Sequence, residues 1–468
     1  MKLLVCTGLL MAAFCTEACA NNPTTATEGP RPVKENVVAR PDSFAVGKVI
    51  DTITCAADAD QSYAAYIPVT GNKKALPVIY FFDPHASGSL PLRKYKALAD
   101  KYGFLLIGSN NSKNGNDWQV TDAIWQTLSE DTKKRFKIDL QRIYTAGFSG
   151  GAKVAGFAAL NHPEIKGVIA NGAGLPDGAE AGNYAFSFTA ITGEGDMNMT
   201  ELVAVSAAFD KTSTPHRLML FNGKHEWAPE KTMEVAFAGF QFDAMRNKLL
   251  PVNTTFLNSF VANSKQTVEA YTKENLLLKA TAECVLASNL LQGLTADATW
   301  FSSKATALSK QEAYKQQYQE RQQLLQEEQT MKANYMQQFN QGDVDYWKKE
   351  IADLQTKAKS PTARGAMYQR LLAYLSLAFY SFSNQLVGNH RDVGAEYYVN
   401  LYKIVDPTNS EAWYFSAILH ARANDLAAVE ADLLKAVEYG FNDKARLHAQ
   451  NDFVGREINF SKIESGMK

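Results

Sequence analysis

The stretch GFSGG, residues 147–151, places a serine between glycines where the chain changes its pattern. Residues 142–146 form a short apolar run of strand type, and from Ala152 to Phe157 the apolar residues recur at helical spacing. A tight strand-to-helix turn of the form G-x-S-x-G strains the serine backbone and leaves no room for β-carbons beside it. Such a turn holds the Ser149 hydroxyl clear of the sheet, beside the Gly150 N–H, where an oxyanion is stabilised. The stretch therefore predicts a nucleophilic serine.

This nucleophile needs a base and a carboxylate, because a serine hydroxyl alone does not react at neutral pH. The run FSFTAIT leads into Gly-Glu-Gly-Asp at 193–196, and RLMLF leads into the loop Asn-Gly-Lys-His-Glu-Trp that holds His225. Among the seven histidines, His225 alone lies on a glycine-containing loop directly after a late strand. The acid is expected at Asp196, which lies deeper in its loop than the alternative Glu194. Asp83, after an earlier strand, is the other alternative.

The elements that must position these residues are strands and helices in alternation, from about residue 45 to 230. This alternation predicts a doubly wound α/β fold, with a mostly parallel sheet and helices on both faces. The runs VIYFF, FLLIG and LMLF are continuously apolar, as in strands buried on both faces. Helices are expected at Leu90–Tyr102 and Lys153–His162. The predicted strands are Lys48–Thr54, Ser62–Ile67, Pro77–Phe82, Phe104–Gly108, Arg142–Ala146, Gly167–Ala170, Phe186–Thr192 and Arg217–Phe221.

Beyond about residue 230 the strand patterns stop and helical segments follow one another. The Gln/Glu/Lys-rich stretch 309–341 is polar nearly all round, which is typical of a solvated helix between other elements, with a coiled-coil surface as the alternative. Ala-Phe-Tyr at 378–380 recurs as Ala-Trp-Tyr at 412–414, a spacing of 34 residues. This period resembles tetratricopeptide (TPR) repeats over roughly 365–443, with about two units. A plain helical bundle with an accidental period is the alternative.

Residues from about 45 to 230 resemble the α/β-hydrolase family. The resemblance rests on the GxSxG turn, the late aspartate loop and the Gly-x-His loop before Trp-Ala-Pro. Within that family they are similar to secreted carboxylesterases and to the branch of polyhydroxybutyrate depolymerases and feruloyl esterases. The resemblance implies that Ser149 is the nucleophile, that His225 is the general base and acid, and that Asp196 orients the imidazole.

The resemblance also implies that a second oxyanion donor, beside Gly150, comes from the loop at 83–88. The family usually has His-Gly at this point, whereas this chain has His85-Ala86. Alanine tolerates a positive φ poorly, so two alternatives stay open: the donor shifts from Ala86 to Ser87, or it stays at Ala86 in a tighter oxyanion hole. Pro84 is excluded because it has no N–H. His85 is a candidate substrate contact, with a loop-shaping hydrogen bond as the alternative.

The polar run at 109–118 is a candidate site for hydroxyl-rich substrates. Asn110 and Asn111 would supply hydrogen bonds, and Trp118 would stack on a ring; the alternative is an exposed loop. Trp227 is either a pocket wall or part of the core. The expected substrate is a small-molecule ester or an ester linked to a polysaccharide.

The first twenty residues predict a signal peptide, with a basic start, an apolar stretch and Ala-Cys-Ala at 18–20. Cleavage by signal peptidase and acylation of Cys19, which would give a membrane tether, both stay open. The protein is thus expected to be exported: periplasmic, secreted or lipid-anchored at the cell envelope. Only Cys55 and Cys284 are unambiguously mature, and two distant cysteines predict no disulfide framework. The expected domains are 1–20 signal peptide, 21–44 polar linker, 45–250 hydrolase, 251–360 helical region and 361–468 TPR-like repeats.

The composition is that of a globular protein, with 46% hydrophobic and 21% charged residues. Lys+Arg 48 against Asp+Glu 49 gives a net charge of -1, which offers no basis for nucleic-acid binding. No HExxH motif, Cys/His cluster or glycine-rich phosphate loop occurs, so neither a metal nor an organic cofactor is expected. The sequence predicts an exported serine hydrolase that cleaves carboxylic esters. The alternatives are a serine peptidase with the same triad and a catalytically vestigial scaffold that binds a protein partner through its TPR-like half.

Overall fold

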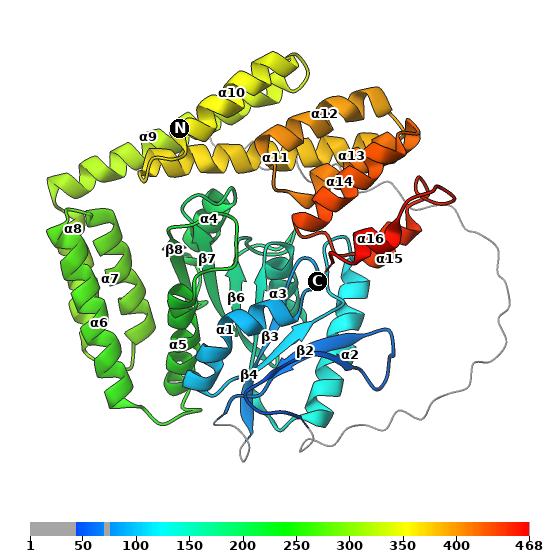
Figure 1. Ribbon diagram of the computed structural model, residues 1–468. Coiled ribbons are helices and arrows are strands. Elements are labelled where there is room, and N and C mark those ends of the chain that lie inside the picture. The colour runs from blue at the N-terminus through cyan, green and yellow to red at the C-terminus, as the bar shows by residue number, and fades with distance from the viewer. Residues whose placement is uncertain (1–43, 70–74, 468) are drawn as a thin grey trace. The chain divides into compact units, whose positions relative to one another are not determined.

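The strands of the described residues form a single sheet in the order β1-β2-β4-β3-β5-β6-β7-β8, and Figure 1 labels all of them except β1 and β5. The computed structural model describes residues 44–69 and 75–467. The predicted signal peptide, Cys19 and nearly all of the linker lie outside these residues. The strands are β1 Val49–Thr54, β2 Ser62–Tyr66, β3 Leu76–Phe82, β4 Leu105–Ser109, β5 Ile138–Phe148, β6 Ile165–Asn171, β7 Ser187–Gly193 and β8 His216–Phe221.

The sheet is mostly parallel, as the sequence predicts. β2 pairs antiparallel with β1 and β4, whereas every neighbouring pair from β4 through β3 to β8 is parallel. Residues 77–82 of β3 and all of β7 are buried, because helices cover both faces. The carboxyl ends of β3, β5, β6, β7 and β8 therefore meet at one edge, where the loops that carry the candidate site residues begin.

Five helices cover this sheet. Helices α2, α3 and α4 pack on one face through side chains such as Trp125, Ala155 and Phe209. Helices α1 and α5 pack on the other face through Tyr95 and Phe237. The predicted helices correspond to α1 and α3; α2 was not predicted, and its first residue, Trp118, is the last residue of the polar run 109–118. Their bounds are α1 Ser89–Tyr102, α2 Trp118–Arg135, α3 Gly150–Asn161, α4 Met199–Phe209 and α5 Glu230–Arg246.

The remaining chain is entirely helical in the described residues. Helices α6 to α8 pack with α5 around Phe242 and Phe301, and α9 to α12 share a second cluster around Trp347. Helix α9 is solvated over most of its length, as expected, and buries only Glu328 and Tyr335. The helices are α6 Thr254–Lys273, α7 Leu277–Leu291, α8 Asp297–Ser309, α9 Glu312–Gln338, α10 Val344–Lys357, α11 Ala363–Gly388, α12 Asp392–Val405, α13 Ser410–Arg422, α14 Leu426–Glu438, α15 Lys444–Ala449 and α16 Phe460–Glu464.

The 34-residue period falls on consecutive helix pairs, α11 with α12 and α13 with α14. The equivalent positions Ala378 and Ala412 are both buried, as are Val399 and Leu433. The shared burial explains why the sequence repeats, because each pair presents the same positions to its neighbour. Membership of the TPR family stays a prediction, as do the expected domain boundaries.

The cysteines of the described residues are both buried free thiols, Cys55 after β1 and Cys284 in α7. Burial raises the pKa of the Cys55 thiol to about 12 and that of Cys284 to about 11. They lie in different hydrophobic clusters. None of the described helices is long and apolar enough to cross a bilayer.

Candidate active site

Ser149 lies at the turn between β5 and α3 in a strained backbone conformation. Its φ is 53° and its ψ is -124°, a region that costs a non-glycine residue of order 1–3 kcal/mol. The turn is tight enough to exclude its neighbours' β-carbons: a Cβ at Gly147 would lie 1.9 Å from the Gly151 carbonyl oxygen, and one at Gly151 would lie 2.0 Å from the oxygen of Phe82. The two glycines are therefore a steric requirement of the turn that presents Ser149.

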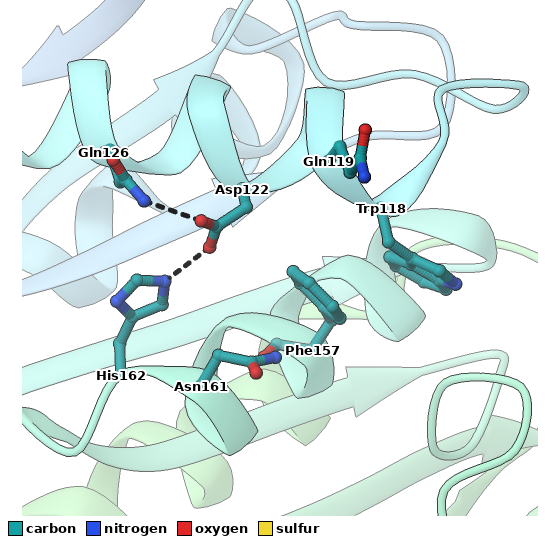
Figure 2. Close-up of a pocket in the computed structure, with 7 residues that line it drawn as sticks. All are labelled: Trp118, Gln119, Asp122, Gln126, Phe157, Asn161 and His162. Carbon is teal, nitrogen blue, oxygen red and sulfur yellow. Dashed lines mark hydrogen bonds and ion pairs between the residues drawn. The ribbon is translucent and has the colours of Figure 1, made fainter.

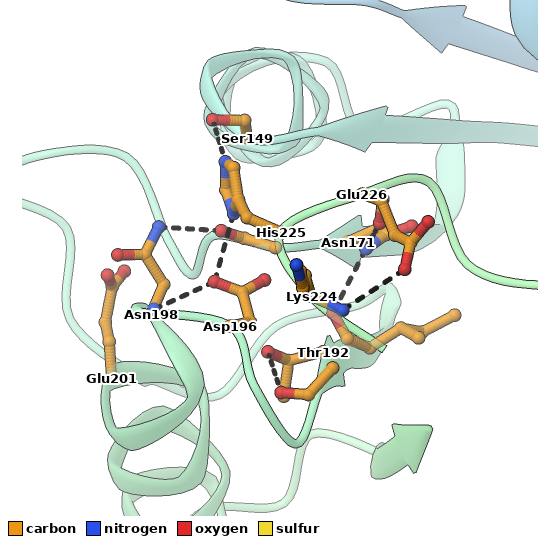
Figure 3. A network of polar contacts seen from close by, with 12 residues as sticks. Ser149, Asn171, Thr192, Asp196, Asn198, Glu201, Lys224, His225 and Glu226 are labelled. Atoms are coloured by element: carbon orange, nitrogen blue, oxygen red, sulfur yellow. Dashed lines mark hydrogen bonds and ion pairs between the residues drawn. The ribbon is translucent and has the colours of Figure 1, made fainter. Parts of the chain in front are cut away.

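His225 lies between Ser149 and Asp196 and contacts both (Figure 3). Its Nε2 lies 2.9 Å from Ser149 Oγ, and its Nδ1 lies 3.0 Å from Asp196 Oδ1. A carboxylate at Nδ1 favours a proton on that nitrogen, which leaves Nε2 to accept the serine proton. The structure thus brings the three predicted residues into one hydrogen-bonded line.

Asp196 is completely buried, in the loop between β7 and α4. Its Oδ1 also accepts the Asn198 N–H at 2.9 Å, and the Asn198 side chain donates to the Gly172 carbonyl at 2.8 Å. Neither alternative acid contacts the histidine. Glu194 pairs with Lys279 at 3.0 Å, and Asp83 accepts the indole N–H of Trp227 at 2.8 Å.

Asn171, the last residue of β6, holds the segment that follows His225. The buried Asn171 amide accepts the Ala228 N–H at 2.7 Å and donates to the Glu226 carbonyl at 3.2 Å. Helix α1 holds the same segment, because the Tyr95 hydroxyl donates to the Ala228 carbonyl at 2.7 Å. Sequence reasoning missed Asn171, whose neighbours gave no local signal.

The Gly150 N–H opens α3 and therefore has no carbonyl partner within the helix. In the loop 83–88 the two candidate donors differ. Ala86 has a φ of 57°, and its N–H donates to the Asp83 carbonyl at 3.1 Å. The Ser87 N–H has no backbone partner among the described residues. Of the two, Ser87 therefore keeps an amide available for an oxyanion.

Asn114 connects this loop to the serine turn, and sequence reasoning did not single it out. Its N–H donates to the Pro84 carbonyl at 2.9 Å. Its Oδ1 fills the space beside Gly150, 1.9 Å from where a Cβ would be built. The local signal was the polar run 109–118 itself, which was interpreted as a substrate surface or an exposed loop.

Three of the predicted substrate contacts are engaged in holding the fold, and this corrects the expectation. The Asn110 amide donates to the Asp51 carbonyl at 3.0 Å, and the Asn111 amide donates to the Asp60 carbonyl at 2.8 Å. Both side chains thus fix their loop to the β1–β2 region. Trp227 is buried and packs against Phe81, so it belongs to the core.

The other two predicted contacts remain accessible. His85 is exposed, and its N–H donates to Asp83 Oδ1 at 3.0 Å in the shaping of its loop. Trp118 is the first residue of α2 and is 37% exposed. One face of its indole stacks on Phe157 of α3, with ring centroids 4.6 Å apart.

Trp118 and Phe157 form one wall of a surface hollow of about 600 Å³ between α2 and α3 (Figure 2). Polar side chains face them. Asp122 contacts both His162 Nε2, at 2.8 Å, and the Gln126 amide, at 2.6 Å. The hollow is also lined by Gln119 and Asn161.

No protein-family model and no curated protein matches this chain. Among solved structures, the chain is similar to an esterase from the archaeon Pyrobaculum calidifontis, at 14% identity over 45% of this chain and 88% of that one, with a TM-score of 0.34. It is similar to a fluorophosphonate-binding serine hydrolase of Staphylococcus aureus, at 13% identity over 42% of this chain and 99% of that one (TM-score 0.35). It is also similar to an S-formylglutathione hydrolase of Agrobacterium tumefaciens, at 15% over 42% and 94% (TM-score 0.32). At these TM-scores the likeness carries no argument, and the α/β fold class rests on the sheet itself.

Proposed function

We propose that this protein is a serine hydrolase that cleaves carboxylic esters through an acyl-enzyme. The single observation that carries the proposal is the line of contacts from Ser149 Oγ through His225 to Asp196, with steps of 2.9 and 3.0 Å. The glycine turn supports the same role, because its strained backbone exposes the Ser149 hydroxyl at the edge of the sheet where the parallel strands end.

In the acylation half of the proposed reaction, Ser149 Oγ forms a bond to the ester carbonyl carbon while His225 Nε2 takes its proton. The carbonyl π electrons move to the oxygen, which the N–H groups of Gly150 and Ser87 would hold. The tetrahedral intermediate then collapses, the bond to the alcohol oxygen breaks, and the imidazolium gives its proton to the leaving alcohol. Asp196 stabilises the imidazolium throughout.

In the second half, water attacks the acyl carbon while His225 Nε2 takes a proton from it. Collapse of this second intermediate breaks the bond to Ser149 Oγ, which recovers its proton from the imidazolium. The acid product leaves and the resting arrangement returns. Every step uses side chains and backbone amides of the chain.

We propose two classes of substrate: small-molecule esters, and larger substrates in which the ester is linked to a polysaccharide. Phe157 lies eight residues after Ser149 on α3, about 12 Å at the helical rise. A chain of sugar rings bound at Ser149 by its ester would thus reach the free face of Trp118. In the lining of the hollow, the Gln119 amide suits a hydroxyl group, whereas the amides of Gln126 and Asn161 already donate to Asp122 and to the Phe157 carbonyl.

Export of the protein is part of the same proposal. The apolar start of the chain and the polar tract after it support export, with or without acylation of Cys19. A protein partner for the TPR-like half is a further part of this proposal, supported by the helix pairs of α11 to α14.

The test is covalent labelling of the purified protein by a fluorophosphonate, together with hydrolysis of short p-nitrophenyl esters. Wild type should be labelled at Ser149, and Ser149→Ala should lose labelling and at least about 10⁴-fold in kcat. Ser302→Ala, at an exposed serine of α8, is the matched control and should behave as wild type. Folded wild type that is neither labelled nor active would overturn the proposal.

Two further assays separate the alternatives. A panel of p-nitroanilides tests the peptidase reading, which requires amide turnover comparable to ester turnover. Capture of a partner by the Ser149→Ala/His225→Ala protein, with an inactive wild type, would favour the scaffold instead.

A further inference from the structure

The loop that carries Asp196 is anchored on two sides. On the sheet side, the Glu194 N–H donates to the Phe221 carbonyl at 2.8 Å and the Gly195 N–H donates to the Gly223 carbonyl at 2.9 Å. These bonds tie it to the end of β8 and to the histidine loop. On the other side it touches α11, a helix almost two hundred residues later in the chain.

Arg370 of α11 makes this second contact. Its Nη1 donates to the Glu194 carbonyl at 2.6 Å, and the same atom lies 3.9 Å from the sulfur of Met199. Glu194 and Met199 stand two residues before and three residues after Asp196. The guanidinium thus touches both ends of the short segment that contains the candidate catalytic acid.

The Arg370 side chain is itself held in place by buried charges. Its Nε and Nη2 both donate to Glu328 Oε2 of α9, at 2.8 and 2.6 Å. Glu328 is completely buried, and its other oxygen lies 2.7 Å from the ammonium of Lys332. Arg370 is only 4% exposed. Because the guanidinium is planar and rigid, the two bonds from Nε and Nη2 to Glu328 also fix the direction in which Nη1 donates.

Packing around the loop leaves it little freedom. A Cβ added at Gly195 would lie 2.3 Å from the Gln369 side-chain oxygen, so α11 lies directly against the loop backbone. A second ion pair, between Glu194 and Lys279 of α7, restrains the same loop from another helix. The helical part of the chain therefore forms one wall of the acid loop.

We propose that Arg370 is a positioning residue for the hydrolase site, which fixes Asp196 relative to His225 through the Glu194 carbonyl. This inference rests on the proposed function. Only Gly195 separates Glu194 from Asp196, so their Cα atoms lie at most about 7 Å apart. An error of 1 Å in the placement of a catalytic group lowers the rate by about 10². The helical region is then a structural part of the active site.

Stability alone is a poor explanation for this buried network. A buried ion pair is often replaceable by apolar side chains of similar volume without loss of stability, so helix packing does not require it. Apolar side chains cannot supply a donor to the Glu194 carbonyl, which would lose its hydrogen bond from Arg370.

The experiment compares Arg370→Met with wild type in the full-length protein. We expect kcat for a p-nitrophenyl ester to fall about 10- to 100-fold with KM little changed, because the loss lies in the orientation of the acid. In an Asp196→Asn background the same substitution should have an effect of less than about 3-fold, since the acid no longer acts. If Arg370→Met only reduced the amount of folded protein, it would instead lower kcat by the same factor in wild type and in Asp196→Asn.

Hydrogen exchange provides a readout that needs no activity. In Arg370→Met, amides of the peptide 193–199 should exchange faster than in wild type, whereas those of β5 should not change. Arg422→Met is the matched control: Arg422 pairs with Asp392 and Asp452 within the helical region and does not touch the loop. It should keep wild-type kcat and wild-type exchange at 193–199.

Two further variants keep the inference testable if Arg370→Met does not fold. Arg370→Lys retains a cation with a single donor nitrogen and should keep part of the kcat that Arg370→Met loses. Glu328→Gln retains the guanidinium but removes the charge of its partner, and should lower kcat less than Arg370→Met does. Folded variants with wild-type kcat and unchanged exchange at 193–199 would overturn the inference. Failure of the hydrolase proposal would be seen separately, as wild type that Ser149→Ala does not alter.

Discussion

Asn171 and Ser149 are joined directly: the Asn171 carbonyl accepts the Ser149 N–H at 2.8 Å. The side chain of the same residue clamps the segment after His225, at the carbonyl of Glu226 and the N–H of Ala228. One residue at the end of β6 thus holds the backbone of the nucleophile with its main chain and the loop of the base with its amide.

Asn171→Ala should therefore lower kcat while the chain still folds. The loss of two buried hydrogen bonds should reduce the free energy of unfolding by about 1–3 kcal/mol. Displacement of His225 by about 1 Å should lower kcat about 10²-fold. Ester kinetics and urea unfolding measure the two effects, with the exposed Asn263→Ala as control. An Asn171→Ala protein with wild-type kcat would contradict this role.

Gly151→Ala should destabilise the protein although Gly151 lies in a helix. Alanine normally favours a helix over glycine by roughly 0.5–1 kcal/mol, but the new Cβ would lie 2.0 Å from the Phe82 oxygen, a backbone atom that cannot move aside. We expect a loss of about 1–3 kcal/mol in thermal or urea unfolding. Gly388→Ala, near whose Cβ no atom lies within 4 Å, is the control and should be neutral or slightly stabilising. Equal stabilities of the two variants would count against the steric reading.

Asp243→Asn should lower the free energy of unfolding at neutral pH and make it less dependent on pH in the acid range. Burial raises the pKa of the Asp243 carboxyl, but the charges and hydrogen bonds of Arg217 and Arg246 outweigh it and hold the pKa below its usual value. A depressed folded pKa means that the stabilisation is present above about pH 4 and is lost as the pH falls through the folded pKa.

Removal of the Asp243 charge leaves Arg217 buried without its partner, which should cost about 3–5 kcal/mol at pH 7. The difference from wild type should shrink below pH 4. Unfolding in guanidinium chloride from pH 3 to 7 measures the free energy of unfolding of wild type and of Asp243→Asn as a function of pH. Asp353→Asn, in an exposed pair with Lys357, should change stability by less than about 1 kcal/mol. Two parallel curves for Asp243→Asn and wild type would refute the linkage.

Trp118→Ala should affect only large substrates. If the free face of the indole stacks on a sugar ring, its loss should raise KM for a polysaccharide-linked ester about 2- to 10-fold, the equivalent of 0.5–1.5 kcal/mol. Short p-nitrophenyl esters do not reach the hollow and should keep their KM. Trp300→Ala, at a similarly exposed tryptophan of α8, is the control. A KM raised equally for both substrates would place the effect at Ser149 instead.

The strands of the fold were predictable from the sequence because several are compact apolar runs between turn residues, as in β3 and β4. The run LMLF of β8 was expected to be buried on both faces, but this strand lies at the edge of the sheet and buries only alternate residues. The order of β3 and β4 was not predictable, since both runs are buried on both faces and either would fit either place. Helix α2 was not among the helices named from the sequence. Asp117 caps it by accepting the Val120 N–H, but the preceding polar run suggested a continuing loop.

The candidate site divides in the same way. Ser149, Asp196 and His225 each carry a local signal, a glycine turn or a loop after a strand, and the structure brings them together. Asn171 and Arg370 carry none, because their partners lie 55 to 57 and 176 residues away. Asn110 and Asn111 were assigned to substrate because their type suits that role, whereas their amides bond the chain itself.

The two buried thiols, Cys55 and Cys284, have a practical consequence for anyone who produces the protein. Within residues 44–69 and 75–467 no covalent cross-link joins distant parts of the chain. Assembly of this part then needs neither an oxidant nor a disulfide isomerase, and a reducing bacterial cytosol should yield it as well as an oxidising compartment does.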